Sequence, residues 1–380
     1  MKRILLITLD YYPDVGGVAN YIHQFAGALS AKDIIVYAPI AEGTKAWDDK
    51  QPYTIVRKKQ LSPKFIWPRW FPLFFTARKL IKEYQINLVL VHHVLPVGYV
   101  ARMLKRALKV PYLVFSHGTD VLLGTKNTWK RRMMRVAVEK SEQMIFNSES
   151  LKKRFLRVFP QFENKSQVLY PCPDAMFFSK PEDQMLNDLR AQYALVGKRV
   201  MLSVSRLVDG KGFPHLVRVL SRVVKEVPDL VWCIIGSGEK QAYILELIRE
   251  HHLQNVVRFI GEVPHEQLVP YYYLADLFTL LTHPDEGQEE GLGLVFLEAA
   301  AAGIPVVAGK SGGVEEAVLH TQTGLMVDVR QDGDAVIADT IVKILKDPTY
   351  AKKLGEQAKE RMSAQFRWEH QLGVISSWID

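Results

Sequence analysis

The chain of 380 residues is long enough for two domains, and its 48% hydrophobic and 24% charged residues are typical of folded globular proteins. No run of about 18 or more uncharged apolar residues occurs, which argues against a membrane-spanning helix. The net charge of +8 divides unevenly between the two halves of the chain. Residues 1–175 carry 28 Lys and Arg against 13 Asp and Glu, a net of +15, and residues 176–380 carry 21 Lys and Arg against 28 Asp and Glu, a net of −7. We therefore expect the first half to meet an anionic partner.

The first predicted element is a buried parallel strand over the apolar run 2–9, followed by a loop and a helix over about 18–31. Asp10 ends the apolar run too early for a signal peptide, and two cysteines without metal-site spacing indicate a reduced, cytoplasmic protein. Gly16 and Gly17 lie in the loop, where the backbone can pass close to a phosphate or a sugar, although a plain tight turn fits equally well. Their spacing is not that of a dinucleotide fingerprint.

A basic segment follows the second predicted strand, at 34–40. Residues 57–110 contain twelve Lys and Arg against one acidic residue. Aromatic residues interleave with these cations, as in segments that lie at a membrane surface, where aromatics reach the headgroups and cations meet anionic lipid. A loop with its aromatics in the core is the alternative, and no motif supports nucleic-acid binding. The candidate membrane or acceptor contacts are Lys64, Trp67, Arg69 and Trp70.

Two further strands are predicted over 86–93 and 111–117. The second strand ends in His117, and ligands of α/β proteins bind beyond the carboxyl ends of parallel strands. His117 is therefore a candidate to hydrogen-bond a substrate hydroxyl or to carry a proton, although a capping histidine fits the same position. We interpret His92 and His93 as packing residues.

The α/β pattern restarts with a strand predicted over 199–207. This strand leads into a glycine-containing turn with Arg206 and Lys211. A planar guanidinium and a lysine ammonium can together neutralise a diphosphate, although two exposed cations in a turn are the simpler interpretation. A strand over 230–235 precedes Gly236, but the third glycine of a dinucleotide fingerprint is absent, which argues against NAD.

The most informative stretch is THPDEGQEEGLGLVFLEAAAAGIPVVAGKSGGV at 282–314. It predicts a loop that turns into a helix over 294–302 with Gly303 as its C-terminal cap. Amides at the helix N-terminus attract phosphate, and the loop glycines let the backbone approach a ligand. Glu290 and Glu298 can accept hydrogen bonds from sugar hydroxyls, although alone they fit a solvated surface helix. The candidate ligand-facing residues between them are Gly291, Leu292, Gly293 and Leu294.

Strands that alternate with helices in two successive blocks predict an α/β protein with two doubly wound parallel sheets that face a cleft. The sequence Asp332-Gly333-Asp334 superficially resembles a metal-binding D-x-D motif. Its place between a strand and a helix favours a turn and an N-cap, so no metal site is predicted.

In their order and spacing, these motifs resemble retaining glycosyltransferase family 4, which has the GT-B fold of two Rossmann-like domains. The resemblance covers essentially the whole chain, and its motifs include the SGG turn at 311–313. It implies an acceptor-binding domain over 1–172, a linker over 173–198, a nucleotide-sugar-binding domain over 199–362 and a C-terminal helix over 363–380 that crosses back to the first domain. At 168–174 the chain departs from the Asn-Gly-Val-Asp sequence of many relatives.

The resemblance also implies roles for individual residues. His117 would lie near the donor sugar and the acceptor, Arg206 and Lys211 would hold the diphosphate, and Glu290 would hold the sugar hydroxyls. Glu298 would hold the ribose. The backbone near Val263 would meet the nucleotide base. The other donor-binding residues would be Gly16, Gly17, Gly236, Gly291, Leu292, Gly293 and Leu294.

The implied reaction is the transfer of a hexose, with its anomeric configuration kept, to a hydroxyl of a lipid, lipid-linked or polysaccharide acceptor. The stretch 282–314 is most similar to bacterial GDP-mannose-dependent mannosyltransferases of the phosphatidylinositol mannoside type, which favours GDP-mannose as donor. The alternatives are a UDP-sugar-dependent enzyme of cell-surface polysaccharide assembly and a non-enzymatic, membrane-surface sugar-binding protein. We expect no metal, no other cofactor and no nucleic-acid partner, and a cytoplasmic protein attached peripherally to the anionic inner face of the membrane.

Overall fold

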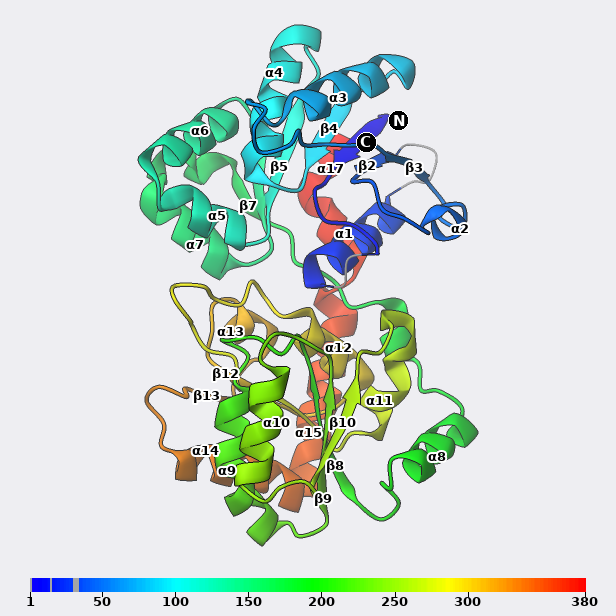
Figure 1. The fold of residues 1–380 in the computed structure, drawn as a ribbon, viewed down its shortest axis with the longest axis vertical. Helices are drawn as coiled ribbons and strands as arrows, with labels where there is room; N and C mark the ends of the chain where they lie inside the picture. The colour runs from blue at the N-terminus through cyan, green and yellow to red at the C-terminus, as the bar shows by residue number, and fades with distance from the viewer. Residues whose placement is uncertain (1, 14–15, 30–33) are drawn as a thin grey trace. The chain divides into compact units, whose positions relative to one another are not determined.

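The computed structural model describes residues 2–13, 16–29 and 34–380, and the chain divides into two compact units (Figure 1). The first unit comprises the chain up to Pro171 together with Trp368–Asp380, and the second comprises Cys172–Arg367. Each unit contains one parallel sheet with helices packed on it, which confirms the predicted α/β class with two doubly wound parallel sheets.

The sheet of the first unit has seven parallel strands in the order β3-β2-β1-β4-β5-β6-β7. Its central strands are short, continuous apolar runs, such as ILLI in β1, and all four of those residues are buried because helices cover both faces. The strands are β1 (Ile4–Ile7), β2 (Ile34–Ala38), β3 (Thr54–Arg57), β4 (Leu88–Val91), β5 (Tyr112–Ser116), β6 (Gln143–Phe146) and β7 (Ser166–Val168).

Alternate residues of these strands point to opposite faces of the sheet. Leu5 and Ile7 of β1 share one apolar cluster with Leu73 and Ala77 of α3 and with Leu104 of α4. On this side α4 packs beside α3 and α6, and elsewhere α1 packs beside α16. The helices of this unit are α1 (Gly17–Ala28), α2 (Lys45–Asp48), α3 (Phe71–Glu83), α4 (Tyr99–Leu108), α5 (Thr119–Thr125), α6 (Thr128–Glu139), α7 (Glu149–Val158), α16 (Trp368–Gln371) and α17 (Ser376–Ile379).

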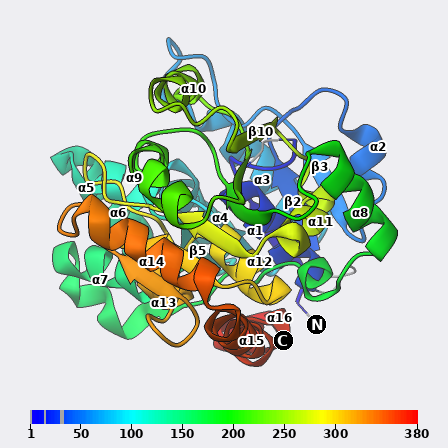
Figure 2. The same ribbon diagram turned by 90° about the horizontal axis from the view of Figure 1, so that it is seen from below.

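The sheet of the second unit has six parallel strands in the order β10-β9-β8-β11-β12-β13. The strands are β8 (Arg199–Val204), β9 (Leu230–Ile235), β10 (Val257–Gly261), β11 (Leu277–Leu280), β12 (Val306–Gly309) and β13 (Leu325–Val327). Helix α9 packs beside α10 and α14, and α12 packs beside α11 and α15 (Figure 2). The helices are α8 (Asp183–Gln192), α9 (Phe213–Glu226), α10 (Gln241–Glu250), α11 (Val269–Leu274), α12 (Leu294–Ala302), α13 (Val314–Ala317), α14 (Asp334–Lys346) and α15 (Pro348–Gln365).

Helix α12 has the predicted bounds. Its alanine run favours helix, and Gly303 ends it in the left-handed conformation, with φ +81° and its amide bonded to the carbonyls of Ala299 and Ala300. The helix is almost completely buried, so small side chains let it pack closely beside α11 and α15.

Several predicted strands are longer than those observed. The apolar run 86–93 contains β4, which ends at Val91, so His92 and His93 follow the strand instead of belonging to it. Similarly, β5 ends at Ser116 and leaves His117 in the loop. An apolar run alone does not mark the point where a strand loses its partners, because buried loop residues are apolar or aromatic too.

The segment 173–198, which we predicted to be a linker, contains α8 and belongs to the second unit. The C-terminal segment belongs to the first unit, where Trp368 packs against Tyr21 and Phe25 of α1, with ring centroids 5.7 and 5.8 Å apart. Lys2 Nζ also donates to the Trp378 carbonyl at 2.6 Å.

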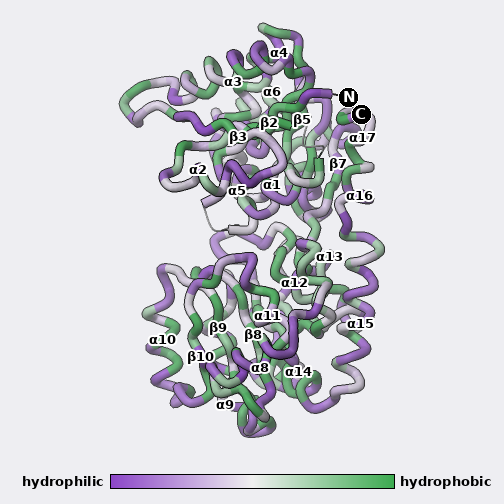
Figure 3. Tube along the Cα trace, turned by 90° about the vertical axis from the view of Figure 1, so that its right-hand side faces the viewer, coloured by the Kyte–Doolittle hydropathy of each residue, from purple (hydrophilic) through white to green (hydrophobic). Residues whose placement is uncertain are grey.

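Hydrophobic residues concentrate along the strands of each sheet, whereas α15 is largely hydrophilic (Figure 3). Within the described ranges, none of the helices has the length and apolar character that crossing a membrane requires.

Candidate functional site

The backbone of Glu290 is held by the SGG turn that follows β12. The Glu290 amide donates to Ser311 Oγ at 3.1 Å, and the Gly313 amide donates to the Glu290 carbonyl at 3.0 Å. Gly312 has φ +55°, and a Cβ at this position would lie 2.2 Å from the Glu290 carbonyl oxygen. The turn therefore requires glycine and sets the position of the glutamate.

Lys211 reaches Glu290 from a second loop. The adjacent Gly212 has φ +81°, and a Cβ there would lie 2.0 Å from the Leu281 carbonyl, so this loop packs directly on the chain beyond β11. Lys211 Nζ lies 2.5 Å from Glu290 Oε2, and both side chains are 21% exposed. Two residues 79 positions apart thus form a charge-assisted hydrogen bond at the carboxyl edge of the sheet.

Arg206 lies on the same loop as Lys211 but is exposed, and its side chain forms no hydrogen bond or ion pair with the described residues. Its loop packs on the loop after β9, because a Cβ at Gly236 would lie 2.0 Å from the Ser205 carbonyl. The Gly236 amide in turn donates to the Gly261 carbonyl at 2.8 Å, and half-buried Val263 follows. The loops after β8, β9 and β10 therefore lie side by side.

The N-terminus of α12 has no side-chain cap. Gly293 stands at the N-cap with φ +86°, and a Cβ there would lie 2.5 Å from the Phe296 ring. Leu292 is buried, whereas Gly291 and Leu294 are partly exposed. The first amides of a helix lack intrahelical acceptors and carry partial positive charge, so this end suits an anion.

Glu298 is buried, with 3% of its surface exposed. Tyr272 donates its hydroxyl to Glu298 Oε2 at 2.7 Å, and His265 Nδ1 lies 3.8 Å from Oε1. Burial raises the pKa of the Glu298 carboxyl. The candidate residue Glu298 is therefore enclosed and hydrogen-bonded to a tyrosine. Its spacing from Glu290 in the sequence did not indicate this burial or this partner.

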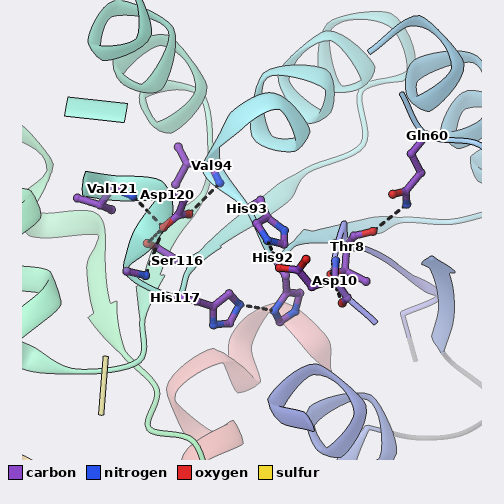
Figure 4. Close-up of polar contacts among 11 residues, drawn as sticks. Thr8, Asp10, Gln60, His92, His93, Val94, Ser116, His117, Asp120 and Val121 are labelled. Carbon is purple, nitrogen blue, oxygen red and sulfur yellow. Dashed lines mark hydrogen bonds and ion pairs between the residues drawn. The ribbon is translucent and has the colours of Figure 1, made fainter. Parts of the chain in front are cut away.

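In the first unit, His117 belongs to a cluster of polar residues at the carboxyl ends of β1, β4 and β5 (Figure 4). His92 Nδ1 lies 3.2 Å from His117 Nε2, and His93 Nε2 donates to Asp10 Oδ2 at 3.1 Å. Our prediction assigned His92 and His93 to packing, and both in fact take part in this polar cluster.

The loop that carries His117 is held by Asp120. One carboxylate oxygen of Asp120 accepts from Ser116 Oγ at 2.6 Å and from the Val121 amide at 2.9 Å, and the other accepts from the Val94 amide at 3.2 Å. Asp120 thus ties the start of α5 to the end of β4.

Both His92 and His117 are neutral near pH 7. Burial lowers the pKa of His92 well below its usual value and lowers the pKa of His117 to about 4. The hydrogen bond from His93 holds the pKa of Asp10 below its usual range, so this carboxyl is ionised.

Gly16 caps α1, and its carbonyl accepts from the Asn20 amide at 3.1 Å. Its backbone is extended, and no described atom lies within 4 Å of a Cβ built there. Gly17 begins α1 and is exposed. Among the described atoms, none therefore fills the space that a side chain at Gly16 would enter.

The four candidate membrane contacts differ in exposure. Trp67 is 76% exposed, and Lys64 and Arg69 are exposed as well, although Arg69 Nε donates to the Ser62 carbonyl at 3.1 Å. Trp70 is half-buried, and its ring packs against Tyr99 and the core. It is a core-edge residue because it immediately precedes α3, whose apolar face it extends.

The second unit thus brings together the loops that carry Arg206, Lys211, Glu290, Gly236 and Val263. Sequence reasoning did not identify Tyr272 as a functional residue, since it stands in a run of three tyrosines, nor the supporting roles of Asp10 and Asp120. Within the described ranges, no group of three or more His, Cys, Asp or Glu residues could hold a metal ion.

Two family models match the chain. The model described as Glycosyltransferase Family 4 matches residues 15–175, and the model described as Glycosyl transferases group 1 matches residues 187–361. Among similar proteins, GDP-mannose-dependent alpha-(1-6)-phosphatidylinositol monomannoside mannosyltransferase of Mycobacterium tuberculosis is 31% identical over 100% of this chain and 98% of its own. GDP-mannose-dependent monoacylated alpha-(1-6)-phosphatidylinositol monomannoside mannosyltransferase of Corynebacterium glutamicum is 27% identical over 97% of this chain and 95% of its own.

Solved structures give the same fold. The crystal structure of Anabaena HepE in complex with UDP has a TM-score of 0.83 at 20% identity and covers 99% of this chain and 98% of its own. Sucrose-phosphate synthase from Thermosynechococcus elongatus has a TM-score of 0.80 at 24% identity, and the match covers 99% of this chain and 98% of that protein's chain. The chain therefore belongs to the family 4 glycosyltransferases of the GT-B fold, and it is a glycosyltransferase.

Proposed function

We propose that this glycosyltransferase moves a mannosyl group from GDP-mannose to a hydroxyl of a lipid-linked acceptor and keeps the anomeric configuration. Relatives that match essentially the whole chain are named as GDP-mannose-dependent enzymes that act on phosphatidylinositol mannosides, which supports both the donor and the acceptor class. The observation that carries the proposal is the 2.5 Å contact of Lys211 with Glu290, in the unit that also contains the uncapped N-terminus of α12.

In this proposal the leaving diphosphate is stabilised by positive charge alone. Lys211 is a point charge, Arg206 offers a planar fork without a competing partner among the described residues, and the first amides of α12 add a helix-end dipole. Preorganised charges of this kind make the largest single contribution to the rate enhancement of many enzymes. Cationic side chains take the place that a metal ion has in other phosphate-transferring sites, so the proposal includes no metal.

Glu290 would bind the hydroxyls of the transferred sugar. Its carboxylate accepts two directional hydrogen bonds, and the SGG turn holds its backbone from both sides. Glu298 would accept from the ribose through Oε1, while Tyr272 occupies Oε2. Gly236 and Val263 would line the path of the nucleotide.

The first unit would supply His117, Gly16 and Gly17 to the donor sugar and the acceptor. The acceptor oxygen forms a bond to the anomeric carbon on the face from which the phosphate leaves, and the departing phosphate takes the hydroxyl proton. This scheme needs no carboxylate nucleophile. The open space beside Gly16 supports a close approach of ligand to this loop.

Calorimetric titration with GDP, UDP and their mannose and glucose conjugates tests the donor. We expect GDP and GDP-mannose to bind, and transfer to a lipid extract to give an α-linked product whose configuration is read by NMR. Preference for UDP would redirect the assignment to a UDP-sugar enzyme. Binding without any turnover would support a sugar-binding protein instead.

We further propose that the first unit attaches to an anionic membrane through an apolar patch formed by Phe65, Ile66, Trp67, Phe71 and Phe75. All five side chains are exposed, with Phe65 at 86%. Exposed cations stand between these residues or follow them in the sequence, at Lys64, Arg69, Arg78, Lys79 and Lys82. Aromatic rings enter the headgroup layer, and each nearby cation adds about 1 kcal/mol at an anionic surface. A cytoplasmic protein would meet such lipid at the inner face of the membrane.

Co-sedimentation with vesicles tests this attachment. The wild type should bind phosphatidylcholine vesicles that contain anionic phosphatidylglycerol, and binding should weaken in high salt. A double substitution, Phe65→Ser with Trp67→Ser, should reduce binding about tenfold or more, since two exposed rings are lost. Tyr243→Ser is the matched control, because Tyr243 is an exposed aromatic of the acidic second half. Equal binding of both variants would refute the patch.

A further inference from the structure

His92 is a buried histidine in direct contact with the candidate residue His117. Its side chain is fully enclosed, with its ring stacked on Phe115 at a centroid distance of 4.4 Å and nearly parallel to the His117 ring, whose centroid lies 5.4 Å away. The edges of Tyr21 and Phe25 close the remaining sides at 5.9 and 5.2 Å. An enclosed ring of this kind has one orientation, so its Nδ1 atom stays directed at His117.

The contact between the two rings holds a single proton. His92 Nδ1 and His117 Nε2 lie 3.2 Å apart, and both rings are neutral, so exactly one of these two nitrogen atoms is the donor. If His117 donated, the proton of neutral His92 would lie on its Nε2. If His92 donated, its Nε2 would be a bare acceptor and the proton of His117 would lie on Nδ1.

The surroundings of His92 Nε2 decide between these arrangements. This atom is buried and has no hydrogen-bond partner in the described part of the chain. A buried N–H without an acceptor is rare and costly in proteins, whereas an unused acceptor lone pair is tolerated more often. The arrangement in which His92 Nδ1 donates is therefore the more stable one.

We propose that His92 is a positioning residue that fixes His117 as the neutral Nδ1–H tautomer, so that His117 acts on the substrate as a hydrogen-bond donor and not as a base. The inference rests on the proposed function for the identity of that substrate, but the tautomer itself does not. A donor at this position would hold a hydroxyl oxygen of the sugar or of the acceptor, while the departing phosphate takes the proton.

The neighbouring charged groups are consistent with this assignment. Asp10 is already engaged by His93 at 3.1 Å, and both carboxylate oxygens of Asp120 accept from the backbone or from Ser116. Neither carboxylate forms a hydrogen bond with His117 among the described contacts. As a whole residue, His117 is only partly buried, so a ligand can approach it.

Nitrogen NMR of the whole chain tests the tautomer directly. Protein labelled with ¹⁵N-histidine gives long-range proton–nitrogen correlations that distinguish a protonated Nδ1 from a protonated Nε2, and a His117→Ala spectrum assigns the signal. We expect His117 to carry its proton on Nδ1 from pH 6 to 8. Protonation on Nε2 would overturn the inference, whatever the donor sugar.

Two substitutions at His92 test the functional consequence. His92→Asn places an amide donor where Nδ1 stands, and His92→Phe keeps the stacked ring without a donor. We expect His92→Phe to lower kcat about tenfold with little change in KM, and His92→Asn to recover most of the loss, because one hydrogen bond is removed and restored. Thermal unfolding shows whether both variants fold.

The outcomes separate the inference from the proposed function. Equal kcat in both variants and the wild type would exclude a positioning role. If His92→Asn keeps the Nδ1–H signal of His117 but is as slow as His92→Phe, the role is also excluded. Wild-type protein that transfers no sugar but shows the Nδ1–H signal would contradict the proposed function and leave the tautomer established.

Discussion

At the scale of single residues, the site depends on groups that hold each other in position. Lys211 and Glu290 are each 21% exposed, so their 2.5 Å contact is only partly screened by water. Removal of either side chain leaves the other without its hydrogen bond. In the proposed reaction, loss of Lys211 also removes a charge that faces the diphosphate, and loss of Glu290 removes the group that faces the sugar.

Lys211→Ala should therefore lower kcat/KM at least about 100-fold, the usual effect of removing one charge-stabilising donor. Its free energy of unfolding should change by no more than about 1 kcal/mol, because partly exposed ion pairs contribute little to stability. Steady-state kinetics and thermal unfolding measure the two effects. Lys346→Ala is the control, since Lys346 forms a similar 2.6 Å pair with Glu226. Equal activity of both variants would remove Lys211 from the site.

Glu298→Gln should raise stability and weaken donor binding. Burial raises the pKa of Glu298 in the folded state above its pKa in the unfolded state. As the pH rises from the unfolded-state pKa to the folded-state pKa, ionisation of Glu298 therefore lowers the free energy of unfolding. The stability gain of the neutral variant should therefore be larger at pH 7 than at pH 4.5, as measured by denaturant unfolding. Glu246→Gln, at an exposed position of α10, should change stability by less than about 0.5 kcal/mol. A variant that loses stability at pH 7 would contradict this account.

At the scale of elements, the site is built from loops at the carboxyl ends of strands, and glycines let these loops pack on one another. The clearest case is the SGG turn, in which Gly312 leaves no room for a Cβ beside the Glu290 carbonyl. The backbone of this turn thereby determines where the Glu290 side chain stands.

Gly312→Ala should shift the Glu290 loop and lower kcat. The affinity for GDP should fall less, because GDP lacks the sugar that Glu290 is proposed to hold. The substitution should also cost about 1–3 kcal/mol in unfolding free energy, since an L-residue is strained at φ +55° and the Cβ collides with backbone. Gly333→Ala is the matched control, with open space around the Cβ and an ordinary φ of −68°. Kinetics, GDP calorimetry and denaturant unfolding compare the two variants. Normal kcat in Gly312→Ala would show that the turn does not set Glu290.

Gly16→Ala should impair activity without affecting the stability of the fold. No described atom lies within 4 Å of the added methyl group, and the extended backbone accepts any residue, so stability should change by less than about 0.5 kcal/mol. The methyl group should nevertheless reduce kcat/KM about tenfold, because it occupies the space proposed for the donor sugar. Unaltered kinetics would exclude Gly16 from the donor contacts.

At the scale of the whole molecule, the first unit is completed by the end of the chain. Trp368 packs on Tyr21 and Phe25 of α1, so residues far apart in sequence share one apolar layer over the first sheet. Trp368 is half-buried, and partial burial of a large side chain in such a layer contributes about 1–2 kcal/mol.

Trp368→Ala should accordingly increase amide hydrogen exchange in α1 and lower the melting temperature, with little change within the six-stranded sheet of the second unit. Trp129→Ala is the control, because Trp129 is 57% exposed on α6. Exchange measured by mass spectrometry resolves the two units. Uniform destabilisation of both sheets would show that the C-terminal segment supports the whole chain and not the first unit.

Much of the fold follows from the sequence because its signals are local. Apolar runs such as ILLI mark buried parallel strands, and the alanine run closed by Gly303 marks α12 with its observed bounds. The partly exposed edge strand β3 and the short β7 were not predicted, since their sequences lack a continuous apolar run. Helix α8 was not recognised within 173–198, where a linker was expected.

By itself, the sequence determined two α/β blocks, the glycosyltransferase family and the candidate residues, because period, turn chemistry and motif order are properties of neighbouring residues. The roles of those candidates in the reaction stay predictions. Only the tertiary structure decided which groups meet: Lys211 with Glu290, Tyr272 with Glu298, and His92 with His117. These contacts join residues 25 to 79 positions apart. The first and the third arise because parallel strands bring the loops at their carboxyl ends side by side, and the second arises because α11 packs on α12.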